Sequence, residues 1–260
     1  MNQIDIVIPV YNELDRLIDC IDSIQRHTPQ QHNIILVNDN SDDLTIAWMM
    51  NNGYGRNLIT NRETYGFGYS ANRGLQASQS RRTALLNSDT IVTRRWLSTM
   101  MKVADLGFDI VGPSTSHSNG QQCLHDAAGE RFRWSREDID DYAAKRFAEY
   151  DGKLVDCDIF GFCYLIDNKV IDAIGGFDHE LYKDGYYEDW DYVKRAQAAG
   201  LRTAWAQAAY VHHFGASSSY ARFGQEEVVN MSARNEKIFK KRVIEIQNGE
   251  RLKFPIGGKA

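Results

Sequence analysis

Along the N-terminal third of the chain, short apolar runs alternate with stretches whose apolar side chains recur at helical spacing. The runs that predict buried strands, each followed by a proline or by polar residues, are 4–10, 34–39, 57–60 and 83–87. The stretches that predict helices are 13–27, 44–51 and 69–78. Strands that alternate with helices imply right-handed crossovers and a parallel sheet covered on both faces. We therefore predict an α/β fold with a Rossmann-like, mostly parallel sheet flanked by helices.

The pattern is less regular after about residue 96, although it contains no linker-like stretch. It predicts strands at 109–113, 160–166 and 203–210, and helices at 136–149, 169–174, 189–199 and 226–247. A chain of 260 residues is long enough for one large α/β domain or for two closely fused halves. We expect the two halves to pack as one unit.

Polar side chains follow several of the predicted strands at the point where each strand ends. They are Tyr11, Asn12 and Glu13 after the first strand, Asp39 at the end of the second, and Asn87, Ser88 and Asp89 after the fourth. A ligand of a parallel sheet binds outside the carboxyl ends of the strands, so this layout predicts a nucleotide site. The chain lacks G-x-G-x-x-G after its first strand and lacks G-x-x-x-x-G-K-[ST] altogether. A dehydrogenase or a P-loop enzyme would therefore lack its phosphate-binding loop.

Charge and cysteine content indicate which binding partners and which cellular compartment to expect. The net charge of -5 is spread along the chain, which gives no electrostatic reason to expect tight nucleic-acid binding, although a nucleic acid could still be a transient substrate. The four cysteines show no C-x-x-C spacing, which is typical of reduced thiols. We expect no signal peptide, because the first five residues lead straight into a strand pattern, and no apolar run has membrane-spanning length. We expect a cytoplasmic protein, either free or peripheral at a membrane, with no transmembrane segment.

Six blocks of sequence, taken in order, carry a family resemblance. They are IVIPVYN at 6–12, VNDNSD at 37–42, NRETYGFGYSANRG at 61–74, LLNSDTIVTRRWL at 85–97, GGFDHELYKDGYYEDWDYVKR at 175–195 and VHHFG at 211–215. The ordered set resembles the inverting family 2 glycosyltransferases of the GT-A fold, in the branch that includes rhamnosyltransferase-like enzymes of surface-polysaccharide synthesis. The resemblance implies a nucleotide-sugar-binding half at 1–95 and an acceptor-binding and catalytic half of the same domain at 96–217. A C-terminal helix and flexible tail would occupy 218–260.

The resemblance implies a divalent cation, Mn²⁺ or Mg²⁺. The family binds it through an Asp-x-Asp triad, which here reads Asn87-Ser88-Asp89, so Asp89 is the one carboxylate that remains, alongside the donor's phosphates and water. Asp89 could instead cap a following helix. The family also supplies a histidine from the region of His212 and His213; we name both, with a preference for His213, although a histidine there could be a satisfied polar group. The serine-rich stretch that follows them suggests a lid over the donor.

The Glu188-Asp189 pair opens a predicted helix. The resemblance places the general base on Asp189, which would take the proton of the attacking hydroxyl in one displacement that inverts the anomeric carbon. Glu188 could orient the acceptor or be the base itself. Both carboxylates could alternatively serve only to cap the helix and complement its dipole.

Other positions are candidates for contacts with the two substrates. Asp39 could accept a hydrogen bond from the imide N–H of uracil or thymine, or could serve only a local turn, and Tyr11 could stack on the base. The remaining donor-side candidates are Pro9, Asn12, Glu13, Asn72, Arg73, Asn87 and Ser88. The acceptor-side candidates, which resemble family elements or add aromatic surface, are Gly161, Phe162, Asp178 and Trp190.

The function predicted is transfer of a sugar from a UDP- or dTDP-sugar to a hydroxyl acceptor, a saccharide or a lipid-linked saccharide. One alternative keeps the enzyme class and changes the acceptor to a modified nucleobase or a protein side chain. A nucleotidyltransferase is an alternative of another class, but it does not account for the Glu-Asp pair or the histidines. A non-catalytic sugar-binding module is disfavoured by the complete set of Asp89, Asp189 and histidines.

Overall fold

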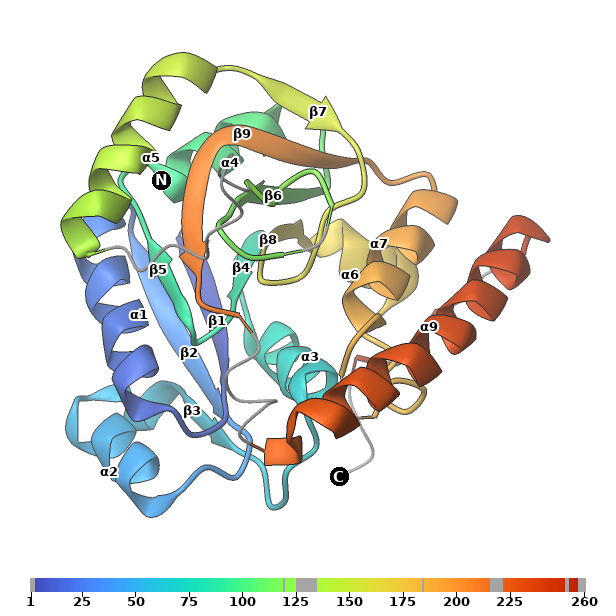
Figure 1. The fold of residues 1–260 in the computed structure, drawn as a ribbon, viewed down its shortest axis with the longest axis horizontal. Helices are drawn as coiled ribbons and strands as arrows, with labels where there is room; N and C mark the ends of the chain where they lie inside the picture. Colours follow the sequence, from blue (N-terminus) through green and yellow to red (C-terminus); the bar gives the residue numbers. More distant parts are fainter. Residues whose placement is uncertain are drawn as a thin grey trace.

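The computed structural model describes residues 3–118, 120–124, 135–183, 185–215, 222–250 and 253–256. Within them the strands form one nine-stranded mixed sheet with helices on both faces (Figure 1). The strand order is β3-β2-β1-β4-β8-β6-β9-β5, and β7 also pairs with β9. The predicted α/β fold is confirmed, but the sheet is not mostly parallel, because four of its strand pairs are parallel and four are antiparallel among the described strands.

The N-terminal part of the sheet is parallel. Its strands are β1 (Ile4–Val10), β2 (His32–Asn38), β3 (Leu58–Thr60) and β4 (Arg82–Leu86). The elements between them are α1 (Leu14–His27), α2 (Asp43–Asn51), the short 3₁₀ helix η1 (Tyr54–Asn57) and α3 (Phe67–Ala77). In the register of β1 and β2, Val10 lies opposite Asn38, and the Asp39 N–H donates to the Val10 carbonyl at 2.8 Å. The residues that follow these two strands therefore emerge side by side.

The rest of the sheet adds antiparallel pairs, which is why the sheet is mixed. Its elements are β5 (Thr90–Val92), α4 (Trp96–Asp105), β6 (Ile110–Ser114), α5 (Arg136–Tyr150), β7 (Leu154–Asp156), β8 (Cys163–Asp167), α6 (Asn168–Ile174), α7 (Glu188–Ala198) and β9 (Thr203–His213). Strand β8 runs antiparallel to β4 and β6, while β9 runs parallel to β6. The far end of β9 turns back to pair with β5, placing His213 opposite Thr90. The long helix α9 (Gln225–Gln247) packs against α7 (Figure 1).

Two clusters of buried side chains cover the two faces of the sheet. Alternate residues of β1, such as Ile6 and Ile8, face the cluster that includes α1 and α4, while Val7 faces α3, α6 and α7. Because both faces are buried, the strands read as continuous apolar runs rather than as an alternation. Helix α3 approaches the sheet so closely that a Cβ on Gly74 would lie 2.1 Å from Cγ1 of Val7.

Short elements held by distant partners escaped sequence reasoning. Strands β5 and β7 have three residues each, and among the described strands both pair only with β9. The paired residues of β9 lie about fifty positions further along the chain for β7 and more than a hundred for β5. The strand expected at 160–166 begins only at Cys163. Helix α4 has Arg95 at its N-cap and β5 precedes it, so Asp89 does not cap this helix. The sheet runs through both predicted halves, and the boundary near residue 95 stays a prediction. In the described part of the chain, no helix combines the length and apolar character needed to span a membrane.

Candidate active site

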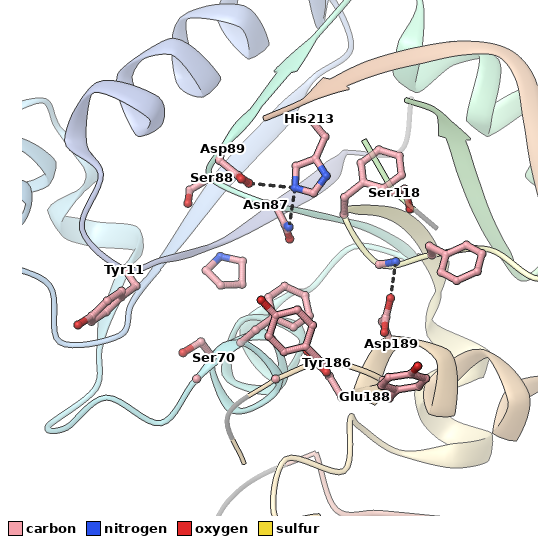
Figure 2. Close-up of a pocket in the computed structure, with 18 of the residues that line it drawn as sticks. Tyr11, Ser70, Asn87, Ser88, Asp89, Ser118, Tyr186, Glu188, Asp189 and His213 are labelled. Atoms are coloured by element: carbon pink, nitrogen blue, oxygen red, sulfur yellow. Dashed lines mark hydrogen bonds and ion pairs between the residues drawn. The ribbon is translucent and has the colours of Figure 1, made fainter. Parts of the chain in front are cut away.

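A cavity of about 580 Å³ opens at the carboxyl ends of β1, β2 and β4. Segments from distant parts of the chain complete its walls, including the turn before α7 and the start of α9. Predicted residues that line it are Pro9, Tyr11, Asp39, Asn87, Ser88, Asp89, Gly161, Phe162, Glu188, Asp189, Trp190 and His213. Figure 2 shows Asp89, Asn87 and His213 together on one side of the cavity and Glu188 and Asp189 on another.

Asp89 and His213 form an ion pair in this wall. The pairing of β5 with β9 brings them together, and Oδ1 of Asp89 lies 3.2 Å from Nε2 of His213. Burial by itself would raise the pKa of the Asp89 carboxyl, but the charge and hydrogen bond of His213 outweigh it and hold that pKa below its usual value. Burial would likewise lower the pKa of the His213 imidazole, and Asp89 raises it instead. Each group thus stabilises the charged form of the other.

The residues around this pair suit a divalent cation that also binds a diphosphate. Nδ1 of His213 lies 2.8 Å from the His117 carbonyl and donates to it, which leaves Nε2 directed at Asp89 and the cavity. The Asn87 amide lies 3.3 Å from Nε2, and its buried Oδ1 has no hydrogen-bond partner among the described residues. A carboxylate oxygen, an amide oxygen and an imidazole nitrogen are ligands that Mn²⁺ accepts. Among the described residues, no three His, Cys, Asp or Glu side chains are grouped so that they could hold an ion by themselves.

His212, also predicted as a metal ligand, does not reach this cavity. Successive residues of a strand point to opposite faces, so the ring of His212 lies on the other side of β9 from His213. Its Nδ1 lies 3.2 Å from the Tyr210 hydroxyl, and its ring packs edge-on against Phe214. Burial and the nearby positive charges of His213 and Arg16 lower the pKa of His212 to about 4. The structure therefore places His213, and not His212, beside Asp89.

Asp189 enters the cavity from the first turn of α7. Its Oδ2 accepts a hydrogen bond of 2.9 Å from the Gly161 N–H, as Figure 2 shows. The two residues are in such close contact that a Cβ on Gly161 would lie 2.5 Å from Cβ of Asp189. Burial raises the pKa of the Asp189 carboxyl, and the hydrogen bond from Gly161 opposes that rise. Gly161 thus fixes the carboxylate in place and favours its ionised form.

Glu188 differs from its neighbour Asp189 in its hydrogen bonding. It is 5% exposed, and its Oε2 is a buried oxygen with no hydrogen-bond partner in the described part of the chain. Burial and the Asp189 charge raise the pKa of the Glu188 carboxyl to about 8. At neutral pH Glu188 is therefore protonated and can donate a hydrogen bond, whereas a base must be ionised. Two neighbouring carboxyl groups, of which Asp189 accepts the Gly161 N–H while Oε2 of Glu188 has no partner among the described residues, are suited to different roles.

Asp39 lines the cavity and also organises the loop that precedes α3. Its Oδ1 accepts from the Asn61 side chain at 2.7 Å and from the Tyr65 N–H at 2.9 Å, and its Oδ2 accepts from the Gly66 N–H at 2.8 Å. Gly66 has a φ of 87°, a conformation that favours glycine. Because a carboxylate has about four acceptor positions, one on Oδ2 remains for a ligand.

Five predicted substrate contacts do not line the cavity, and their contact with a substrate stays a prediction. Asn12 and Glu13 form a left-handed turn after β1, with φ of 55° and 54°, and do not line the cavity. Asn72 is bonded both to the N–H and to the carbonyl of Phe177, and Arg73 donates to the Thr60 carbonyl and to Asn61. Asp178 is buried in an ion pair with Arg242 at 2.8 Å. The polar side chains of Asn72, Arg73 and Asp178 thus bond to neighbouring backbone and side chains.

Several lining residues escaped sequence reasoning. They are Phe67, Ser70, His117, Ser118, Gly185, Arg222, Phe223 and Ser232. Gly185 lies three residues before the Glu-Asp pair, which was a usable signal. Arg222 and Ser232 carry none, because only tertiary packing brings the start of α9 to the cavity. The guanidinium of Arg222 lies 5.3 Å from the centre of the Tyr11 ring. The proposed lid beyond Gly215 and the proposed flexible tail at 257–260 lie outside the described residues.

Comparison with known sequences gives a family match and partial relatives. Residues 5–160 match the family model described as glycosyl transferase family 2. Glycosyltransferase GlyG of Streptococcus pneumoniae is 28% identical over 113 residues, which cover 42% of this chain and 37% of GlyG. Glycosyltransferase AglE of Haloferax volcanii is 24% identical over 212 residues, which cover 78% of this chain and 64% of AglE. The chain thus spans less than two thirds of the length of these curated relatives.

Solved structures with similar folds include sugar transferases. GalNAc-T7, crystallised with UDP, GalNAc and Mn²⁺, has a TM-score of 0.62 at 15% identity, covering 82% of this chain and 43% of its own. The mannosyltransferase PcManGT of Pyrobaculum calidifontis, in complex with GDP-Man and Mn²⁺, has a TM-score of 0.61 at 15% sequence identity. The match covers 95% of this chain and 69% of PcManGT. S. aureus TarS 1–349 has a TM-score of 0.59 at 14% sequence identity, and the match covers 95% of this chain and 72% of the TarS chain. At such identities the likeness concerns the fold, and it confirms the predicted GT-A fold.

Proposed function

The chain belongs to glycosyl transferase family 2, and we propose that it moves a sugar from a nucleoside-diphosphate sugar to a hydroxyl acceptor with inversion at the anomeric carbon. The observation that carries the proposal is that one cavity holds both the Asp89–His213 pair and the Asp189 carboxylate. The first suits a cation with a diphosphate, and the second suits a base. Both are needed when a hydroxyl displaces a nucleoside diphosphate.

Asp189 acts as the base in this proposal. The acceptor oxygen attacks the anomeric carbon while the bond from that carbon to the diphosphate oxygen breaks, and the electron pair leaves with the diphosphate. The hydroxyl proton passes to the Asp189 carboxylate, which the Gly161 N–H holds in position. Glu188, protonated at neutral pH, donates a hydrogen bond that orients the acceptor. A divalent cation held by Asp89 and His213, with the Asn87 amide, would neutralise the charge that develops on the leaving diphosphate.

The donor side favours a base with an imide N–H. Asp39 keeps one acceptor position on Oδ2, and Tyr11 offers an aromatic ring in the same part of the cavity. These features support a UDP- or dTDP-sugar. The fold neighbours were solved with different nucleotides, UDP in GalNAc-T7 and GDP-Man in PcManGT. A panel of donors must therefore contain sugar nucleotides of uracil, thymine and guanine.

The acceptor side is aromatic. Phe160, Tyr186, Tyr187 and Trp190 line the cavity near Asp189. Flat apolar rings suit the faces of sugar rings, which supports a saccharide or lipid-linked saccharide as the acceptor. The rhamnosyltransferase-like branch, a role in polysaccharide synthesis and a cytoplasmic location remain predictions.

The test is donor turnover by the purified protein. We expect slow hydrolysis of one UDP-, dTDP- or GDP-sugar in the presence of Mn²⁺, abolished by a chelator and by Asp89→Ala. The released product distinguishes the alternatives. A glycosyltransferase releases the nucleoside diphosphate from the sugar nucleotide, whereas a nucleotidyltransferase would release pyrophosphate only when a nucleoside triphosphate and a sugar 1-phosphate are supplied, and a binding module would release nothing. NMR of the first-formed sugar anomer tests inversion. Retention of the donor configuration would contradict the single displacement.

A further inference from the structure

The turn that leads into α7 has an unusual backbone. Gly185, Tyr186 and Tyr187 are consecutive residues with positive φ, at 93°, 68° and 75°. This left-handed region suits glycine, whereas bulky side chains such as tyrosine are strained there. Glu188 and Asp189 follow immediately, so the turn sets the direction in which both carboxyl groups enter the cavity (Figure 2).

One side chain of α9 binds this turn directly. The carboxamide nitrogen of Asn235 donates to the Gly185 carbonyl at 2.7 Å and lies 3.2 Å from the Tyr186 carbonyl. Asn235 is fully buried, with 0% exposure, so its side chain is shielded from bulk solvent. A single –NH₂ group has two donors, which matches two successive carbonyl groups.

Helix α9 is held in place by other contacts. The ring of Phe239 stacks on Trp190 with centroids 5.3 Å apart, and Arg242 pairs with Asp178 at 2.8 Å. Removing the Asn235 carboxamide would therefore leave α9 docked while releasing the turn. The helix also lies beyond the segment that matches the family model, where no motif draws attention to it.

We infer that Asn235 is a positioning residue that holds the strained 185–187 turn, so that Asp189 and Glu188 face the substrate. The inference rests on the proposed function, because it assigns Asn235 a part in sugar transfer. A positioning role and a role in packing alone predict different effects on turnover and on donor affinity. Loss of the carboxamide lowers turnover, while the donor side, built from β1, β2 and β4, keeps its affinity.

The test compares two asparagines of the same helix. Asn235→Ala removes both donors, and Asn235→Asp keeps the shape but loses both donors when ionised. Asn230→Ala and Asn230→Asp are the matched controls, because Asn230 is exposed on α9. We expect kcat for both Asn235 variants to fall roughly 10- to 100-fold, the range that a misplaced catalytic group produces. The donor KM should change less than about threefold, and the Asn230 variants should behave as wild type.

Hydrogen–deuterium exchange gives a second readout that needs no substrate. We expect faster exchange of the amides of residues 186–189 in Asn235→Ala, with the strands of the sheet unchanged. Wild-type kcat in Asn235→Ala would overturn the inference, as would an equal loss of donor affinity or failure of both Asn235 variants to fold. If the wild-type protein turns over no sugar nucleotide, the proposed function fails and exchange alone decides. Unchanged exchange at 186–189 then overturns the role of Asn235, and faster exchange supports its hold on the turn.

Discussion

Nε2 of His213 lies 3.2 Å from Oδ1 of Asp89, although 124 positions separate the two residues in the numbering. The antiparallel pairing of β5 with β9 sets this distance, because it places His213 opposite Thr90, the residue after Asp89. A backbone hydrogen bond also joins the two segments, because the Phe214 N–H donates to the Asp89 carbonyl at 3.0 Å. Strand β5, which the sequence did not predict, therefore brings Asp89 and His213 together in the candidate metal site.

The adjacent histidines should differ sharply in their effect on metal-dependent binding. We expect His213→Ala to weaken Mn²⁺-dependent nucleotide binding by at least about tenfold, because it removes a nitrogen ligand. The neighbouring His212→Gln should stay within about threefold of wild type, because His212 lies on the other side of β9. Calorimetric titration of the nucleotide with and without Mn²⁺ measures both. Equal weakening by the two substitutions would contradict the assignment.

The two carboxyl groups of α7 should respond differently to amide substitution. Asp189→Asn should lower kcat by about 10²- to 10⁴-fold while donor affinity stays near wild type, because the amide cannot take a proton. Glu188→Gln should lower kcat at pH 7 by less than about tenfold, because an amide can donate a hydrogen bond as the protonated carboxyl does. Steady-state transfer and donor titration are the measurements. A larger loss from Glu188→Gln than from Asp189→Asn would make Glu188 the base.

Stability should depend on pH through Glu188. Its pKa is raised from 4.5 to about 8 in the folded protein, so between these values the folded state holds a proton that the unfolded state has lost. The free energy of unfolding therefore falls as pH rises through this window, by at most about 1.4 kcal/mol per pH unit for this one group. Glu188→Gln removes this dependence. Urea unfolding at pH 5.5, 6.5 and 7.5 should show the variant gaining stability relative to wild type with each step. A constant difference would show that Glu188 ionises normally in the folded state.

A methyl group at Gly161 should lower activity because it would displace Asp189. In Gly161→Ala the new Cβ would meet Cβ of Asp189 at 2.5 Å, so the carboxylate must move. We expect kcat to fall roughly tenfold to a hundredfold with little change in donor KM. Gly55→Ala is the control, because its Cβ would meet only the Met50 side chain, at 3.5 Å. Comparable kcat values for the two variants would show that Asp189 tolerates displacement.

The sequence by itself determined the fold class, most of the helices and strands, and the residues at the strand ends. Buried strands are continuous apolar runs, and helices repeat their apolar residues at a fixed spacing, so both patterns are local. Parallel neighbours then bring their carboxyl ends to one edge, which explains why Tyr11, Asp39 and Asp89 were found to share a cavity. The Glu-Asp pair was found for a similar reason, because it opens a helix within a recognisable block.

Only the tertiary structure decided how these groups face one another. Which of two adjacent histidines meets Asp89 depends on the register between β5 and β9, and a shift by one residue would exchange them. Asn72 and Asp178 looked like substrate contacts, but their partners, Phe177 and Arg242, come from distant segments. The support that Asn235 gives to the turn before Glu188 likewise joins two separate helices. Such relationships depend on long-range packing, which leaves no periodic signal along the chain.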